Sequence, residues 1–216
     1  MNQSKDLLLK SLRAVLFGEK LDASDFAEAD WKSIFQLADE QTVSALLLDG
    51  ISLLPSECIA IPLGDKLKRI ATMQRIEQIN RLHRKVIVKI DHALKSEGIP
   101  VVFMKGQTTA LRYPNPLHRT PGDIDFVVNP KDFRKTLEIL EKIGKVDHGL
   151  VHEHHGMAWV DGVTVEPHYK VHNYQCLSTD LAMQEMFASV FPSELSSADM
   201  DGYACLSSLQ PSRVYS

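Results

Sequence analysis

The segment GDIDFVV, residues 122–128, decides how the second half of this chain folds. Its apolar run is short and rich in β-branched residues, which predicts a buried strand. Successive side chains of a strand point to opposite faces, so Asp123 and Asp125 project from one face while Ile124 and Phe126 point the other way into the core. The sequence therefore predicts two carboxylates held side by side at the start of a buried strand.

The residues around this segment predict a mixed sheet with helices. IPVVFM (99–104) has the composition of a buried strand, and GMAWV (156–160) and VTVEPHYKV (163–171) form a predicted hairpin across Asp161 and Gly162. Helices are expected over residues 107–113, 129–144 and 181–191, with a proline-rich loop over 113–122. The helix over 129–144 has Asn129 as its cap and Pro130 at its first position.

Before residue 97 the apolar residues recur at intervals of three and four, which is typical of helices. Asp30 is placed to cap the helix WKSIFQLADE, and a long apolar stripe from Leu67 to Leu94 ends near Gly98. We therefore expect an α+β protein with two parts. Residues 1–97 form a helical N-terminal subdomain, and residues 98–216 form an α/β core with a small mixed β-sheet.

Composition limits the possible functions. The chain has 216 residues, of which 44% are hydrophobic, enough for a sizeable core. Its net charge of −4, without a dense basic patch, argues against a long nucleic acid as partner. The N-terminus lacks the apolar stretch of a signal peptide, and no segment approaches the ~20 apolar residues that span a bilayer. Three scattered cysteines argue against a disulfide framework, so a cytoplasmic location is expected.

The paired carboxylates predict a magnesium site. Like charges this close are unfavourable unless a cation lies between them, and Mg²⁺ prefers hard oxygen ligands while leaving positions for phosphate. Gly122 would let the chain approach closely, and Glu166 on a later strand would supply a third acid. This chemistry suits phosphoryl or nucleotidyl transfer. An Asp-X-Asp pair by itself is also common on solvated surfaces, and Glu166 alone is equally consistent with an exposed strand residue.

Several of these segments together resemble a known family. They are IPVVFMKG, the loop ending in Arg119, GDIDFVV, and the strand in which Glu166 precedes Pro167 and His168. The pattern is similar to the uncharacterised nucleotidyltransferase family of the DNA polymerase β-like superfamily, strongly over residues 98–172 and more loosely before them. The resemblance implies a polymerase β-like core. Members typically continue in further helices, so this chain is expected to be C-terminally short relative to the family.

The resemblance also implies a reaction and a site. A nucleoside monophosphate would move from a nucleoside triphosphate to an unidentified hydroxyl acceptor, on a small molecule or a protein. Two Mg²⁺ ions would be held by the catalytic carboxylates, Asp123, Asp125 and Glu166. The residues implied in binding nucleotide phosphates are Lys105, Gly106, Gln107, Arg119, Gly122 and His168. Two positions depart from the superfamily pattern: Gln107 replaces a serine or glycine, and Glu166 replaces an aspartate.

Two other interpretations stay open. Gln107 and the short C-terminus are consistent with a catalytically degenerate domain that binds a nucleotide or a partner protein. A group of histidines in the second half is the basis of the other interpretation, a transition-metal site such as that of a hydrolase. HEHH is not the HExxH zinc signature, so most of these histidines are expected to be polar loop residues. These histidines are His148, His152, His154, His155, His168 and His172. His168 lies two residues beyond Glu166 on the same strand face, where it would approach a metal or phosphate.

Overall fold

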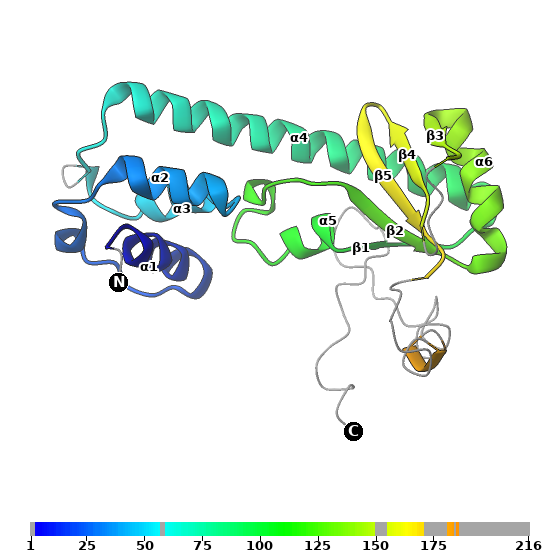
Figure 1. Cartoon of the computed structure of the whole chain (residues 1–216), viewed down its shortest axis with the longest axis horizontal. Coiled ribbons are helices and arrows are strands. Elements are labelled where there is room, and N and C mark those ends of the chain that lie inside the picture. The colour runs from blue at the N-terminus through cyan, green and yellow to red at the C-terminus, as the bar shows by residue number, and fades with distance from the viewer. Residues whose placement is uncertain (1–2, 57–58, 150–154, 171–180, 184, 186–216) are drawn as a thin grey trace. The chain divides into compact units, whose positions relative to one another are not determined.

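A computed structural model describes residues 3–56, 59–149, 155–170, 181–183 and 185 of the chain (Figure 1). The fold is α+β, with a helical N-terminal part followed by strands, as the sequence predicts. The chain forms two compact units, and each is described separately. The first unit comprises residues 1–81 and 110–121, and the second comprises residues 82–109 and 122–216. The subdomain boundary predicted at residue 97 stays a prediction.

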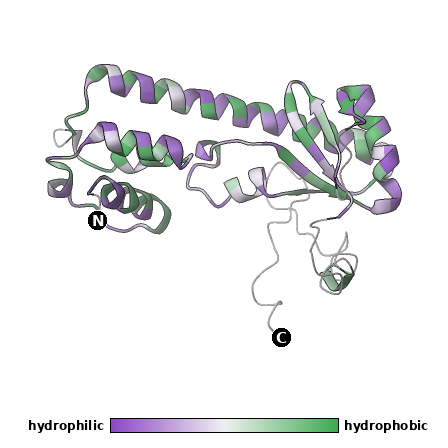
Figure 2. Ribbon diagram, in the orientation of Figure 1, coloured by the Kyte–Doolittle hydropathy of each residue, from purple (hydrophilic) through white to green (hydrophobic). Residues whose placement is uncertain are grey.

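The first unit is a helical cluster built from α1 (Gln3–Phe17), α2 (Trp31–Glu40), α3 (Ser44–Ile51) and the first part of α4 (Leu63–Lys95). Hydrophilic and hydrophobic residues are interspersed along the helices of this unit (Figure 2), and six of the eight residues of α3 are buried. The predicted cap of α2 is confirmed, because the Asp30 side chain accepts a hydrogen bond from the Ser33 backbone N–H. The fully buried side chains of this core include Phe26, Ile34 and Leu47.

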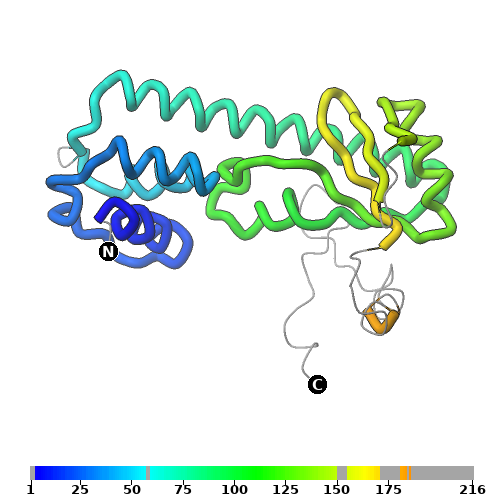
Figure 3. The backbone as a smooth tube through the Cα atoms, viewed as in Figure 1, coloured from blue at the N-terminus to red at the C-terminus, as the bar shows by residue number. Residues whose placement is uncertain are grey.

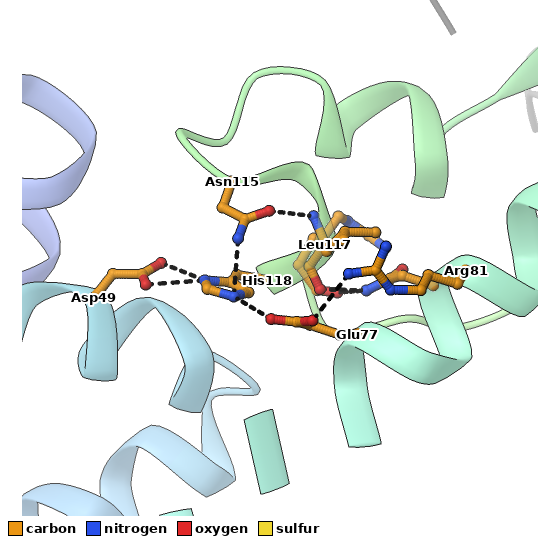
Figure 4. A network of polar contacts seen from close by, with 8 residues as sticks. Asp49, Glu77, Arg81, Asn115, Leu117 and His118 are labelled. Carbon is orange, nitrogen blue, oxygen red and sulfur yellow. Dashed lines mark hydrogen bonds and ion pairs between the residues drawn. The ribbon is translucent and has the colours of Figure 1, made fainter. Parts of the chain in front are cut away.

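In the same unit, a polar network surrounds the buried side chain of His118 (Figure 4). His118 ends a 3₁₀ turn (Pro116–His118), and its Nδ1 lies 2.7 Å from Asp49 Oδ2 while its Nε2 lies 3.1 Å from Glu77 Oε1. The Asn115 amide nitrogen lies beside Nε2, and its oxygen accepts from the Leu117 N–H. Burial opposes a charge on the ring, but hydrogen bonds to Asp49 and Glu77 outweigh it and raise the pKa of His118 above 6.5. The raised pKa favours the protonated ring, and each ring nitrogen faces one carboxylate.

The long helix α4 ends as the sequence predicts. Gly98 adopts φ +71°, a left-handed conformation that favours glycine, and the Ile99 N–H donates to the Leu94 carbonyl at 3.0 Å. This bond closes the last turn and redirects the chain into the first strand. Among the described residues, no helix has the combination of length and apolar character that crossing a membrane requires.

The second unit contains a five-stranded mixed sheet of order β1-β2-β5-β4-β3. The central pair, β2 and β5, is parallel, and the other three pairs are antiparallel. The strands are β1 (Val101–Met104), β2 (Ile124–Val128), β3 (Lys145–Asp147), β4 (Met157–Val160) and β5 (Val163–His168). All residues of β1 and β2 are buried, so both strands belong to the core that the sequence predicts.

The predicted hairpin is confirmed. Asp161 and Gly162 have φ values of 51° and 82°, which match the positive φ values required at both central positions of a type I′ turn between β4 and β5. Strand β3 was not predicted, because its three residues follow a helix directly and only Val146 is buried. The smooth trace in Figure 3 follows the chain from β1 through residues 105–123 into β2.

Helix boundaries differ in detail from the sequence predictions. The helix expected over 129–144 begins as a 3₁₀ turn (Pro130–Asp132) in which the Asn129 side chain accepts from the Lys131 N–H, and α6 spans Phe133–Ile143. The short helix expected over 107–113 is α5, Gly106–Ala110, and the proline-rich residues after it form loop and the 3₁₀ turn that ends at His118. Most of the helix predicted over 181–191 lies outside the described residues.

Candidate functional site

The parallel pairing of β2 with β5 brings two acids from distant parts of the sequence together. Asp125 and Glu166 are direct partners across the two strands. Side chains at paired positions of neighbouring strands project from the same face of a sheet, so the two carboxylates lie on one face. On the other side of β2, Asp125 pairs with Met104, the last residue of β1. Asp125 therefore lies between the end of β1 and the end of β5.

Lys105 follows β1 directly and forms an ion pair with Asp125. Its Nζ lies 2.8 Å from Asp125 Oδ1, and its own φ of 48° is in the left-handed region. The lysine side chain is 60% exposed, whereas that of Asp125 is 4% exposed. The lysine therefore brings a positive charge from the solvent side onto a buried carboxylate, which lowers the cost of burying Asp125 as an anion.

His168, the last residue of β5, contacts both acids through the same ring nitrogen. Its Nε2 lies 3.0 Å from Asp125 Oδ1 and 3.7 Å from Glu166 Oε2. The histidine side chain is 3% exposed. Glu166 and His168 are two residues apart on one strand, so the pleat places them on the same face of the sheet. The structure thus brings His168 beside Asp125 and Glu166, and its expected approach to a metal or phosphate stays a prediction.

The acids have opposite electrostatic environments. Burial opposes the charge on Asp125, but hydrogen bonds from His168 and Lys105 outweigh it and lower the pKa of this carboxyl below its usual value. Burial raises the pKa of Glu166, and repulsion from Asp123 and Asp125 raises it further. Asp123, the half-buried residue that precedes β2, therefore repels the negative charge of Glu166. The three carboxylates predicted to share a site influence each other electrostatically.

The geometry of these side chains suits a metal ion. Ligand atoms of Asp125, Glu166 and His168 all lie within 4.8 Å of one another. Two are carboxylate oxygens, which Mg²⁺ and Mn²⁺ prefer, and the third is an imidazole nitrogen. Asp123 does not belong to this compact set, although its charge acts on Glu166. The donor set therefore fits a divalent cation, with His168 in the position of a possible ligand.

The turn after β1 has a defined local structure. The Thr109 N–H and the Thr108 hydroxyl both donate to the Lys105 carbonyl, at 2.8 Å and 2.6 Å. Gly106 begins α5, and the Gln107 side chain is buried. A Cβ at Gly122 would meet no described atom within 4 Å. The described chain therefore does not require the close approach expected at Gly122.

Arg119 lies in the first compact unit, whereas the acids lie in the second. Its Nη1 donates to the Thr120 carbonyl at 3.1 Å, and its own carbonyl accepts from the Asn80 side chain. These contacts give the arginine a structural partner within its own unit. Its role in binding phosphate stays a prediction.

The described histidines of the second half have different surroundings. His148 is exposed and pairs with Glu141, and the ring of His155 lies 5.1 Å from that of His168. His168 is the histidine that joins acidic groups in the described metal-type cluster. The remaining members of the predicted histidine group, His152, His154 and His172, lie outside the described residues.

Comparison with known proteins shows the family. No curated protein and no solved structure matches the chain. The family described as uncharacterised nucleotidyltransferase matches residues 27–205. The match extends over most of the helical unit, the whole sheet, Lys105 and the three acids. It agrees with the resemblance in the sequence segments around GDIDFVV. The chain belongs to the uncharacterised nucleotidyltransferase family.

Proposed function

We propose that this chain is a Mg²⁺-dependent nucleotidyltransferase that transfers a nucleoside monophosphate from a nucleoside triphosphate to a hydroxyl group. Membership of the family supports nucleotidyl transfer in general. The observation that supports the specific proposal is the pairing of Asp125 with Glu166 across two neighbouring strands. The charge of Asp123 also acts on Glu166. Three acids brought to one place in a folded core are unfavourable unless a cation balances them.

Each acid has a proposed role. Asp123, Asp125 and Glu166 would hold two divalent ions, which supply positive charge to the phosphate oxygens and to the attacking hydroxyl. Asp125 is suited to remain ionised, because its pKa is lowered by its hydrogen bonds. Glu166 would also accept the proton of the acceptor hydroxyl, because its carboxylate is partly exposed beside the buried Asp125.

The remaining residues would bind and orient the nucleotide. The exposed side chain of Lys105 can leave its ion pair with Asp125 and bind phosphate oxygens instead. Its charge would then neutralise the departing pyrophosphate. The backbone around Gly106 and Gln107 would contact the phosphates. Roles for Arg119 and Gly122 are proposed from the family resemblance alone. A small molecule or a protein is the proposed acceptor, since a chain of net charge −4 has no general attraction for a nucleic acid.

One observation favours a second candidate, a nucleotide-binding domain without catalytic activity. Without a metal ion, Lys105 and His168 already occupy the same oxygen of Asp125. A buried carboxylate that is neutralised internally is stable in the metal-free protein. Binding of nucleotide without release of pyrophosphate, tested over a broad pool of hydroxyl acceptors, would support this candidate.

The variant Asp125→Ala tests the proposal. In a thermal-shift panel of the four nucleoside triphosphates, the unaltered protein should be stabilised by at least one of them only when Mg²⁺ is present. At a ligand concentration of about 100 times Kd, the gain is about 2.7 kcal/mol. Asp125→Ala should abolish this gain, and pyrophosphate release should fall with it.

Asp132→Ala is the control, because Asp132 is an aspartate of the second unit that lies outside the proposed site, although it is more exposed than the buried Asp125. It should keep the full response to nucleotide. The proposal is wrong if Asp125→Ala binds nucleotide with Mg²⁺ as well as the unaltered protein does. Circular dichroism of both variants should show that the fold is unchanged.

A further inference from the structure

We infer that His168 Nε2 is itself a metal ligand, and that the site consequently prefers Mn²⁺ to Mg²⁺. The inference rests on the proposed function, because it concerns the same carboxylates, but it assigns a nitrogen donor and an ion preference to them. The residues involved are Asp125, Glu166 and His168, whose ligand atoms form one compact group.

The distances fit one ion with three neighbouring ligands. In an octahedral site with bonds of about 2.1 Å, adjacent donor atoms are about 3 Å apart. His168 Nε2 lies 3.0 Å from Asp125 Oδ1 and 3.7 Å from Glu166 Oε2. The nitrogen is therefore already at the separation of an adjacent ligand from one acid, and a small rotation of the Glu166 side chain would bring the other into place.

The histidine ring is well positioned for this role. It is at the end of β5, where His168 pairs with Val127 of the neighbouring strand β2. The imidazole is buried, and the ring of His155 lies against it at 5.1 Å with an angle of 36° between the planes. A ligand held by strand pairing and ring packing loses little conformational freedom when it binds an ion.

Lys105 contacts the same oxygen but cannot take this role. Its ammonium group lies 2.8 Å from Asp125 Oδ1 and has three donors and no lone pair. It can only compete with a cation, and its 60% exposed side chain is free to move toward solvent. An imidazole, in contrast, has one unprotonated nitrogen when neutral. Coordination through Nε2 requires the tautomer with its hydrogen on Nδ1, so the bond from Nε2–H to Asp125 is replaced by a bond to the metal.

The donor set then decides between ions. Mg²⁺ binds oxygen almost exclusively, whereas imidazole suits first-row transition ions. Mn²⁺ accepts both carboxylate and imidazole and tolerates the octahedral arrangement that a phosphate-binding site needs. Two carboxylates with one imidazole therefore bind Mn²⁺ more tightly than Mg²⁺. If His168 only donates a hydrogen bond to Asp125, the two ions should bind through oxygen alone.

Pulsed electron paramagnetic resonance of the full chain with Mn²⁺ separates these two roles. A directly coordinated imidazole nitrogen modulates the electron spin echo, and this modulation should be present in the unaltered protein. Labelling of histidine with ¹⁵N should change the modulation without any substitution, so the test does not depend on the folding of a variant. Stoichiometric Mn²⁺ without nitrogen modulation, or no Mn²⁺ binding, would overturn the inference.

Variants identify the histidine. His168→Gln should abolish the nitrogen modulation and weaken Mn²⁺ binding by roughly tenfold or more, while Mg²⁺ binding, measured by competition, changes by less than about threefold. His155→Gln is the matched control, because this ring contacts His168 but is not in the ligand group, and it should keep the modulation. Modulation that persists in His168→Gln contradicts the inference.

The result is independent of the nucleotide assay. Nitrogen modulation without any binding of nucleoside triphosphate would retain this inference and contradict the proposed function. Metal-dependent nucleotide binding without nitrogen modulation would retain the proposed function and contradict this inference.

Discussion

Each compact unit contains a buried histidine with one aspartate and one glutamate, and the two groups differ in arrangement. In the first unit, Asp49 and Glu77 approach different nitrogens of His118. In the second unit, Asp125 and Glu166 both approach Nε2 of His168. The first arrangement places one carboxylate at each ring nitrogen, whereas the second gathers three possible ligand atoms close together.

The difference shows that residue types alone do not identify a metal site. A charged ring neutralises two carboxylates that lie on opposite sides of it. Its hydrogen bonds then hold together the segments that contain the two carboxylates. In the second group, burial and repulsion from Asp123 and Asp125 raise the pKa of Glu166, and an added cation would relieve that repulsion. We therefore expect the group at His118 to contribute stability and the group at His168 to contribute metal binding.

Removing the glutamate from each group should give the largest contrast. Glu166→Gln should weaken binding of a divalent ion by roughly 100-fold, or about 2.7 kcal/mol, because a ligand charge is lost. The metal-free protein should keep its stability, since the variant also removes repulsion with Asp123 and Asp125. Glu77→Gln is the matched substitution in the other group, and it should leave metal affinity unchanged. Titration calorimetry with Mn²⁺ measures both, and equal losses in the two variants would contradict the comparison.

Replacing the ring of the first group should affect stability. His118→Gln should destabilise the first unit by about 2 kcal/mol, because Asp49 and Glu77 lose their cation. The value is below that for a fully buried pair, since the two carboxylate side chains are each 26% exposed and water relieves part of the loss. Urea unfolding followed by Trp31 fluorescence, in a Trp159→Phe background, reports on this unit. His92→Gln, at an exposed position of α4, should change the unfolding midpoint little.

The pH dependence of that stability should show the smallest effect. The pKa of His118 is raised in the folded state, so its stabilising contribution is complete below pH 6.5 and is lost as pH rises through the folded pKa. The Trp31 signal should therefore report a decrease in stability above pH 6.5 that is smaller than the loss on removing the ring. His118→Gln should remove this decrease, and an unchanged pH profile in the variant would show that another group is responsible.

Features set by a few adjacent residues were predictable. The end of α4 follows from Gly98 after an apolar stripe, and the hairpin follows from the Asp161–Gly162 pair, which has the conformation its type of turn needs. Strand β3 was missed because its pattern is too short for a periodic signal. Local chemistry therefore predicts turns and long helices better than short edge strands.

The candidate sites depend on contacts that no local pattern contains. The pleat predicts that Asp123 and Asp125 share a face, and that Glu166 and His168 share one. Their meeting depends on the parallel register of β2 with β5, which places His168 against an acid 43 positions earlier in the chain. His118 was not identified from the sequence at all, because its partners lie 69 and 41 positions away. Register and long-range pairing are properties of the whole fold.

The assignment of residues 110–121 to the first unit affects how the chain can be divided into fragments. This segment belongs to the first unit, yet it lies between β1 and β2 of the second. A fragment that begins at residue 122 would keep all three acids but lose β1 and Lys105, leaving the buried strand β2 with an unpaired edge. The second unit as a whole consists of two separate stretches of the chain, residues 82–109 and 122–216. A single truncation therefore cannot separate the two units, because a cut before residue 110 leaves residues 110–121 attached and a cut after residue 121 removes β1 and Lys105.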